Sequence, residues 1–94
     1  MISAIVLINA EVDRIPEVAA AIADLNGVSE VYSVTGDVDL IAIVRVRHHE
    51  ELADIIADQL NKVGGVLGTQ THIAFRTYSK HDLEAAFSLG LDGT

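Results

Sequence analysis

The feature of this sequence that most restricts its fold is a weak internal repeat. Ile22-Ala23-Asp24 recurs as Ile56-Ala57-Asp58, and Gly27-Val28-x-x-Val31-x-Ser33 recurs as Gly65-Val66-x-x-Thr69-x-Thr71. In both copies the pattern passes from the end of a helical stretch, through glycine, into a β-prone stretch. The chain of 94 residues has room for two such halves and little more. Two βαβ halves joined by a hairpin are therefore the arrangement that the repeat predicts.

Hydrophobic periodicity places the elements of the first half. Residues 2–8 are aliphatic on both faces, as expected of a buried strand. Asp13 is positioned to cap the helix that follows, Pro16 falls in its first turn, and Asn26-Gly27 ends it. The buried stripe of this helix is expected to consist of Ile15, Val18, Ile22 and Leu25.

The second half begins with a hairpin, because the strands predicted over 28–34 and 39–46 are separated only by a short turn. A longer helix follows, which begins at His48-His49-Glu50-Glu51 and ends at Gly64-Gly65. Its buried stripe is expected to consist of Leu52, Ile55, Ile56, Leu60 and Val63. A long final strand is predicted over 66–78, and a short C-terminal helix begins at Ser79.

These elements make an α+β, ferredoxin-like βαββαβ sandwich in which helices cover one face of an antiparallel sheet. The other face still carries apolar side chains. Hydrophobic residues make up 50% of the chain, nearly all of them aliphatic, and so short a chain buries only a modest core by itself. We therefore expect a second copy to cover the open face and form a homodimer.

Composition excludes several classes of protein. The formal net charge of −8, from 14 acidic and 6 basic residues, opposes binding to a phosphate backbone, and the basic residues form no cluster. There is no cysteine for a disulfide or a thiolate metal site. The apolar start lacks the basic residues of a signal peptide, and no apolar run approaches the ~20 residues of a membrane span. We expect a cytoplasmic protein that binds neither nucleic acid nor membrane.

Residues that could carry catalysis form no catalytic pattern. Adjacent His48 and His49 point in different directions on a helix, and neither has a histidine at i+4 to complete a metal pair. No serine sits in a nucleophile elbow. The glycine-rich stretch 64–68 lacks the lysine and the helix of a phosphate loop. The sequence thus predicts no enzyme, no metal and no cofactor.

The turn between the hairpin strands offers the clearest candidate site. Thr35-Gly36-Asp37-x-Asp39-Leu40 combines a glycine that permits a tight turn with two carboxylates that could receive an ammonium group. Read locally, the same residues describe an ordinary hairpin turn. Together with Ile43 and Val46, and with Val66-x-x-Thr69-x-Thr71-x-Ile73 later in the chain, they resemble the RAM domain of Lrp/AsnC transcriptional regulators. That domain binds effectors and mediates oligomerisation.

The resemblance covers residues 2–78. Residues 1–78 are expected to form the RAM-like ligand-binding and oligomerisation domain, and 79–94 a C-terminal helix and tail longer than the family's usual one. It implies a dimeric α/β-barrel, dimers that assemble into rings such as octamers, and an amino acid or related metabolite bound between dimers. Residue by residue, it implies ligand contacts from Gly36, Asp37, Asp39, Thr69, Thr71 and His72.

No helix-turn-helix precedes the first strand, so the sequence resembles the stand-alone RAM proteins. Such a chain is expected to sense a metabolite or to co-assemble with a full-length regulator of the family. Two alternatives remain open at this point. A dimeric α/β-barrel enzyme of the antibiotic-biosynthesis-monooxygenase type shares the fold but usually lines its cavity with aromatic residues and histidines, and aromatics are few here. An ACT-like domain also binds amino acids on this scaffold but normally sits beside an enzyme domain.

Overall fold

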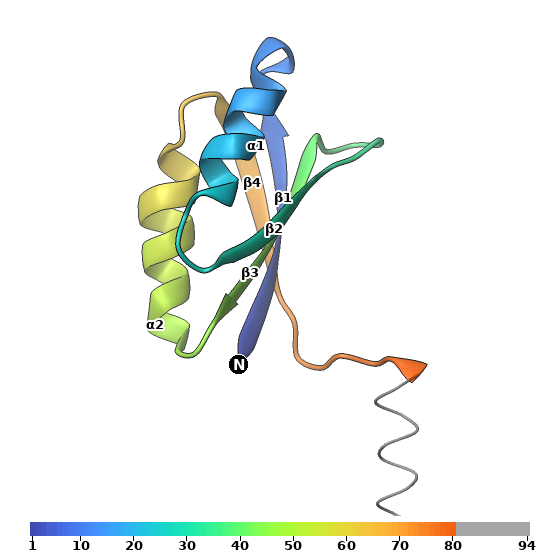
Figure 1. Ribbon diagram of the computed structural model, residues 1–94, viewed down its shortest axis with the longest axis vertical. Coiled ribbons are helices and arrows are strands. Elements are labelled where there is room, and N and C mark those ends of the chain that lie inside the picture. The colour runs from blue at the N-terminus through green and yellow to red at the C-terminus, as the bar shows by residue number, and fades with distance from the viewer. Residues whose placement is uncertain (81–94) are drawn as a thin grey trace, which may run out of the picture.

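In this computed structural model, the structure describes residues 1–80. Its four strands are β1 (Ile2–Ala10), β2 (Val28–Ser33), β3 (Leu40–Val46) and β4 (Val66–Ile73). They form one antiparallel sheet in the order β2-β3-β1-β4, so the two halves of the chain interleave, with β1 and β3 in the centre. The helices lie together on one face of this sheet (Figure 1). The fold is the α+β, ferredoxin-like sandwich that the repeat predicts.

The two helical segments differ in length and winding. The first consists of a 3-10 turn, η1 (Val12–Arg14), followed by α1 (Ile15–Ala23). The second begins as α2 (His49–Leu52), widens into a π-helical stretch, η2 (Ala53–Gln59), and ends in a 3-10 turn, η3 (Leu60–Lys62). As expected from the repeat, the second segment is the longer one. Pro16 lies in the first turn of α1, where its missing N–H costs no hydrogen bond.

The predicted cap of the first helix is wrong. Asp13 lies inside η1, Arg14 takes the position before α1, and no side chain caps this helix. A 3-10 turn therefore takes the place of a capped first turn. A backbone hydrogen bond closes this 3-10 turn, from the Arg14 N–H to the Glu11 carbonyl at 2.9 Å.

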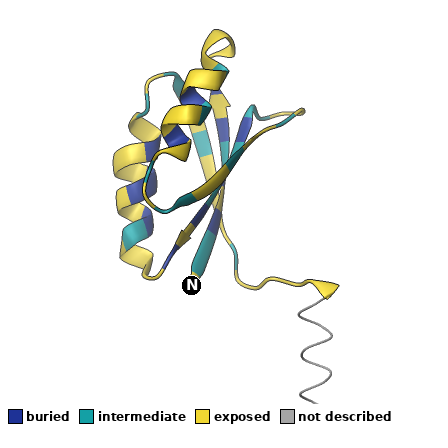
Figure 2. Cartoon of the chain, viewed as in Figure 1, coloured by how far each residue is buried: buried dark blue, intermediate teal, exposed yellow. Residues whose placement is uncertain are grey.

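The core lies between the sheet and the helices (Figure 2). Alternate residues of the two central strands point into it, as the period of a β-strand requires. The buried positions are Ala4, Val6, Ile8 and Ala10 in β1, Leu40, Ala42, Val44 and Val46 in β3, and Val18, Ile22, Leu52, Ile55, Ile56 and Leu60 from the helices. All six helical positions belong to the stripes predicted from the sequence.

The last strand is shorter than predicted, because β4 ends at Ile73 rather than continuing to residue 78. Among the described residues it pairs with β1 alone, and the register places Ile73 opposite Ala4, so residues 77 and 78 would lie beyond Met1 with no backbone to pair with. One further bond, from the Ala74 N–H to the Ser3 carbonyl at 2.9 Å, marks the end of the pairing. The helix predicted from Ser79 lies almost entirely outside the described residues.

No helix among residues 1–80 is both long enough and apolar enough to cross a membrane.

Candidate functional site

Among residues 1–80, no layer covers the face of the sheet opposite the helices (Figure 1). Pairing in the sheet places Ile5 and Leu7 of β1 and Ile41 and Ile43 of β3 side by side on this open face. Leu7, Ile41 and Ile43 are half-buried, and Ile5 is 38% exposed. An aliphatic patch in the centre of a sheet face is typical of a surface that another layer covers.

The turn between β2 and β3 lies at one end of the sheet, beside the end of β1. Gly36 has a φ of 114°, a conformation that L-residues rarely adopt, and no atom lies within 4 Å of the position of an added Cβ. The need for glycine here is therefore conformational rather than steric. Gly36 and Asp37 are exposed, and Asp39 is half-buried.

Asp39 binds the turn to its neighbours through three polar groups. Its carbonyl accepts from the Val34 N–H at 3.1 Å, and its own N–H donates to the Ile8 carbonyl at 3.0 Å. Its Oδ2 accepts from the Ala10 N–H at 2.9 Å, across 29 residues of sequence. The second carboxylate oxygen, Oδ1, makes none of these contacts. Asp39 is thus a structural residue of the turn with one carboxylate oxygen left over.

The candidate residues of β4 lie on two different faces. Thr69 pairs with Ile8 and Thr71 with Val6, so both threonines are on the helix side of the sheet. His72 pairs with Ile5 and is on the open face. Thr69 is two strands away from the start of β3, about 10 Å. Within one chain the turn and these three residues do not form a single pocket.

Thr69 has a partner that the sequence did not suggest. Its Oγ1 lies 2.7 Å from Oδ1 of Asn61, at the end of the second helical segment. The two residues line a hollow of about 270 Å³ together with Val66, Leu67 and Gly68. Asn61 lies between Leu60 and Val63 of the predicted stripe, and no periodic signal could have linked it to β4.

A second hollow of about 270 Å³ lies at the opposite end of the sheet from the turn, beside α2. We call it the α2 hollow. Its lining combines apolar Val46 and Ile55 with polar and charged side chains, and Gly27 approaches Ile55 so closely that a Cβ at residue 27 would clash. The remaining lining residues are Asn26, Arg45, Glu51, Asp54 and Gln59. Neither hollow contains Gly36, Asp37 or Asp39.

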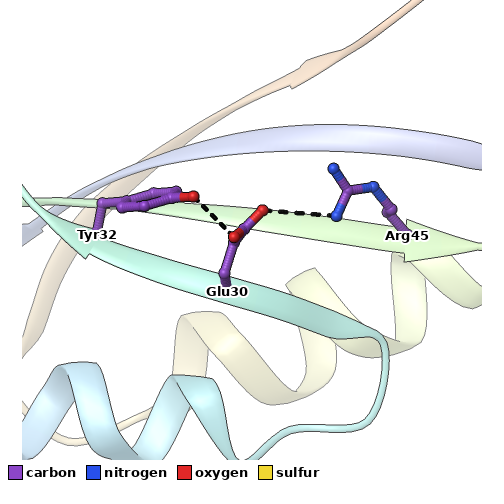
Figure 3. A network of polar contacts seen from close by, with 3 residues as sticks. All are labelled: Glu30, Tyr32 and Arg45. Atoms are coloured by element: carbon purple, nitrogen blue, oxygen red, sulfur yellow. Dashed lines mark hydrogen bonds and ion pairs between the residues drawn. The ribbon is translucent and has the colours of Figure 1, made fainter.

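A polar network spans β2 and β3 at the edge of the open face (Figure 3). The Tyr32 hydroxyl donates to Glu30 Oε2 at 2.7 Å, and the Arg45 guanidinium lies 3.6 Å from Glu30 Oε1. The hydrogen bond to Glu30 raises the pKa of Tyr32. Lost solvation and the charge of Glu30 act in the same direction, and the charge of Arg45 acts against them. Glu30 therefore joins an aromatic ring and a cation on one surface.

Residues 1–80 contain no group of three or more His, Asp or Glu side chains that could hold a metal ion. His48 and His49 are both exposed at the start of α2.

Comparison with known sequences agrees with the fold. The sequence model described as the Lrp/AsnC ligand binding domain matches residues 3–83. The HTH-type transcriptional regulator FL11 of Pyrococcus horikoshii is 32% identical over 77 residues, which are 82% of this chain and 50% of that protein. The chain thus spans about half the length of the curated relatives it matches.

Two solved structures extend the comparison. TTHA0845 from Thermus thermophilus is 45% identical, with a TM-score of 0.80, over 85% of this chain and 100% of that one. The feast or famine regulatory protein of M. tuberculosis, complexed with L-methionine, is 27% identical, with a TM-score of 0.66, over 85% of this chain and 54% of that one.

Proposed function

The chain belongs to the family of Lrp/AsnC ligand-binding domains, and on that premise we propose that it binds a free amino acid or a closely related metabolite and assembles into oligomers. The observation that carries the proposal is the turn 34–39, which presents two carboxylates and a glycine backbone at one end of the sheet. The feast or famine regulatory protein, a relative with the same fold, has been solved with L-methionine bound.

In the proposed site, a carboxylate of the turn receives the ligand's ammonium group. Asp37 is exposed, and Asp39 has Oδ1 in addition to the oxygen that binds Ala10. The exposed backbone at Gly36 adds hydrogen-bonding groups without a side chain in the way. An ammonium–carboxylate hydrogen bond contributes roughly 1.5–3 kcal/mol, which suits a ligand bound reversibly.

The ligand's carboxylate and side chain require further polar groups. Thr69, Thr71 and His72 of β4 offer hydroxyls and an imidazole. They lie two strands away from the turn, with the threonines on the helix side of the sheet and His72 on the open face. A complete site therefore needs the turn of one copy and the strand of another. We place it between dimers, so that ligand binding and assembly are one equilibrium.

Assembly begins with a homodimer in which the open faces of two sheets pack together. The apolar patch of Ile5, Leu7, Ile41 and Ile43 supplies the contact. Further contacts between dimers give rings such as octamers. A full-length Lrp/AsnC regulator could enter the same ring, since it would present the same face.

The proposed role is that of a cytoplasmic modulator of transcription or metabolism that does not itself bind DNA. The chain's relatives are named transcriptional regulators rather than enzymes. A net charge of −8 opposes contact with a phosphate backbone. The alternative is an enzyme of the monooxygenase type, which would usually line its cavity with aromatic side chains. The strands supply only one aromatic side chain to the open face, that of Tyr32, and its hydroxyl is bound to Glu30, which disfavours this alternative.

A binding screen tests the proposal. The chain is titrated with each common amino acid, thermal unfolding is followed, and native mass spectrometry records ligand number and oligomeric state. A ligand that binds the folded assembly raises its melting temperature as its concentration rises. The expected result is one amino acid, or a small group, that does so with saturable stoichiometry. If no amino acid changes the melting temperature, the ligand assignment is refuted. The oligomeric state would then be tested separately, by the mass that native mass spectrometry records.

A further inference from the structure

Residues 74–80, which we call the arm, follow β4 and run away from both helices (Figure 1). Two large side chains on the arm are left exposed by the part of the chain that the structure describes. Phe75 is 98% exposed and Tyr78 is 72% exposed. Aromatic side chains left in water on an extended segment are typical of a surface that docks on another.

The arm also differs from the rest of the chain in charge. Arg76 and Lys80 are two of only six basic residues in a chain with 14 acidic ones, and the arm contains no acidic residue. A cationic, aromatic segment on an acidic protein has a complementary surface available on any other copy of the same chain.

The α2 hollow matches the arm in chemistry. We call its two buried side chains, Val46 and Ile55, the floor, and its more exposed carboxylates, Glu51 and Asp54, the rim. Glu51 Oε2 also accepts from the Arg47 N–H at 3.2 Å, which leaves its negative charge in place. Arg45 also lines it, but Glu30 lies 3.6 Å from this guanidinium and offsets its charge. The volume of about 270 Å³ suits one aromatic ring.

The hollow and the root of the arm lie at the same end of the sheet. Ile2 of β1 pairs with Val46, which lines the hollow, and Ser3, the next residue, accepts the last hydrogen bond of the arm from Ala74. The arm nevertheless leaves on the side away from α2, where a copy packed on the open face would lie (Figure 1).

We propose that the arm of one copy docks in the α2 hollow of a second copy, with the Tyr78 ring on the apolar floor and Arg76 and Lys80 beside Glu51 and Asp54. Alternate side chains of an extended segment share one side, so Arg76 and Tyr78 lie on the same side of the arm, and Lys80 follows two residues later at its helical end. The exchange is reciprocal in a two-fold dimer, which gives two such contacts per pair.

Disulfide trapping tests the contact directly, because the native chain has no cysteine. A Thr77→Cys chain is mixed with a Gln59→Cys chain and oxidised mildly, so any disulfide between the two sites must join two molecules. Gln59 lines the hollow and Thr77 is next to Tyr78. The matched control replaces Gln59→Cys by Ala20→Cys, an exposed position on α1.

The expected result is a 77–59 disulfide that forms at least tenfold faster than the 77–20 disulfide. Equal rates for the two pairs would overturn the proposal. So would a chain carrying both Thr77→Cys and Gln59→Cys that closes its own disulfide while remaining monomeric, because the arm would then dock on its own hollow.

Substitutions measure the contribution of the arm to assembly. Tyr78→Ser is expected to weaken dimerisation at least tenfold by sedimentation, whereas Val12→Ser, at an apolar residue that is 84% exposed, leaves it unchanged. Both side chains are exposed within the chain, so folding is expected to persist, and far-ultraviolet circular dichroism checks it. An unchanged dimer with Tyr78→Ser contradicts the proposal.

A charge exchange tests the pairing of arm and rim. Arg76→Glu alone and Asp54→Lys alone should each weaken the dimer, and mixing the two variants should restore a heterodimer. Asp58→Lys, one turn further along and outside the lining of the hollow, is the control partner and should not restore it. Restoration by both lysine variants would mean that net charge, and not this contact, governs assembly. The result does not depend on amino-acid binding, so the two proposals can fail separately.

Discussion

Ser29 and Leu67 occupy equivalent positions in the two halves of the chain, and each is the extra residue of a β-bulge at the start of an edge strand. In β2, Val28 and Glu30 pair with consecutive residues of β3, so Ser29 has no pairing partner. In β4, Val66 and Gly68 pair with consecutive residues of β1, so Leu67 has none. Beyond the bulge, Val31 in β2 and Thr69 in β4 face the helices. The sequence repeat therefore has a counterpart in backbone geometry.

The bulge in β2 determines what the open face presents. It lets Val28 and Val31, three residues apart, both face inward, although a regular strand would place them on opposite sides. Glu30 and Tyr32 then face outward, where Glu30 meets Arg45. The network of Figure 3 depends on that one extra residue.

Ile43→Asp should weaken the homodimer. Ile43 lies in the apolar patch of the open face, and a carboxylate there would be buried without a partner. Breaking complementarity in this way costs about 3 kcal/mol or more, which is at least a hundredfold in the dissociation constant. Sedimentation velocity across a concentration series measures it. Ala57→Asp, at an exposed helical position, serves as the control, and equal behaviour of the two variants would rule out the open face as the interface.

Asp39→Ala should lower both stability and ligand affinity. The Ala10 N–H would lose its acceptor, at a cost of about 1–3 kcal/mol in the free energy of unfolding. If Asp39 also binds the ammonium group, the affinity of the folded assembly falls roughly ten- to a hundredfold. Urea unfolding gives the first quantity and titration calorimetry, at a temperature where the variant is folded, gives the second. Affinity that stays constant would assign Asp39 to the fold alone.

Gly36→Ala and Gly68→Ala form a matched pair. A Cβ has open space at both positions, but only Gly36 has a positive φ. Gly36→Ala should therefore cost about 1–2 kcal/mol through the left-handed conformation, while Gly68→Ala should be close to neutral. Denaturant unfolding of the two variants compares them. Equal losses would contradict a conformational requirement for glycine in the turn.

Alkaline titration should report the contact between Tyr32 and Glu30. Because the folded state raises the pKa of Tyr32, the contact stabilises the fold fully below the unfolded value of about 10. That contribution is lost as the pH rises through the folded value. In a Tyr78→Phe background, phenolate absorbance should rise at a higher pH than in the same chain carrying Glu30→Ala. Coincident titration curves would mean that the hydrogen bond is absent in solution.

The chain alone should not bind DNA. Its net charge of −8 repels phosphate, and low salt is the condition most favourable to any phosphate contact. A mobility-shift assay at low ionic strength should therefore show no retarded complex at micromolar protein. Saturable retardation that weakens with added salt would contradict this prediction.

Periodicity and the repeat predicted the element order and the helical stripes, because each depends on spacing within a few residues. They did not predict the end of β4 at Ile73, which depends on its register with β1, a strand far away in the sequence. The bulges and the π-helical stretch of the second helical segment were missed for a similar reason. Such irregularities arise from packing between elements and leave little local signal.

The candidate site was predictable in part. The turn with Gly36 and Asp39 is visible as a local pattern, whereas the bond between Asp39 and Ala10 joins residues 29 positions apart. The opposite faces of Thr71 and His72 follow from the alternation of any strand, so the sequence already contained that division. The pairing of Thr69 with Asn61 had no signal at all.

The contacts of Asp39 with β1 also remove an ambiguity of register. Because β1 is aliphatic on both faces, a slip of one residue would exchange Val6 and Ile8 for Ile5 and Leu7 in the interior with little change in apolar area. Asp39 recognises two groups of β1 together, the carbonyl of Ile8 and the N–H of Ala10. A shifted strand would not present that pair to it. A turn residue at the edge of the molecule thus selects which side of the central strand becomes interior and which is left for a partner.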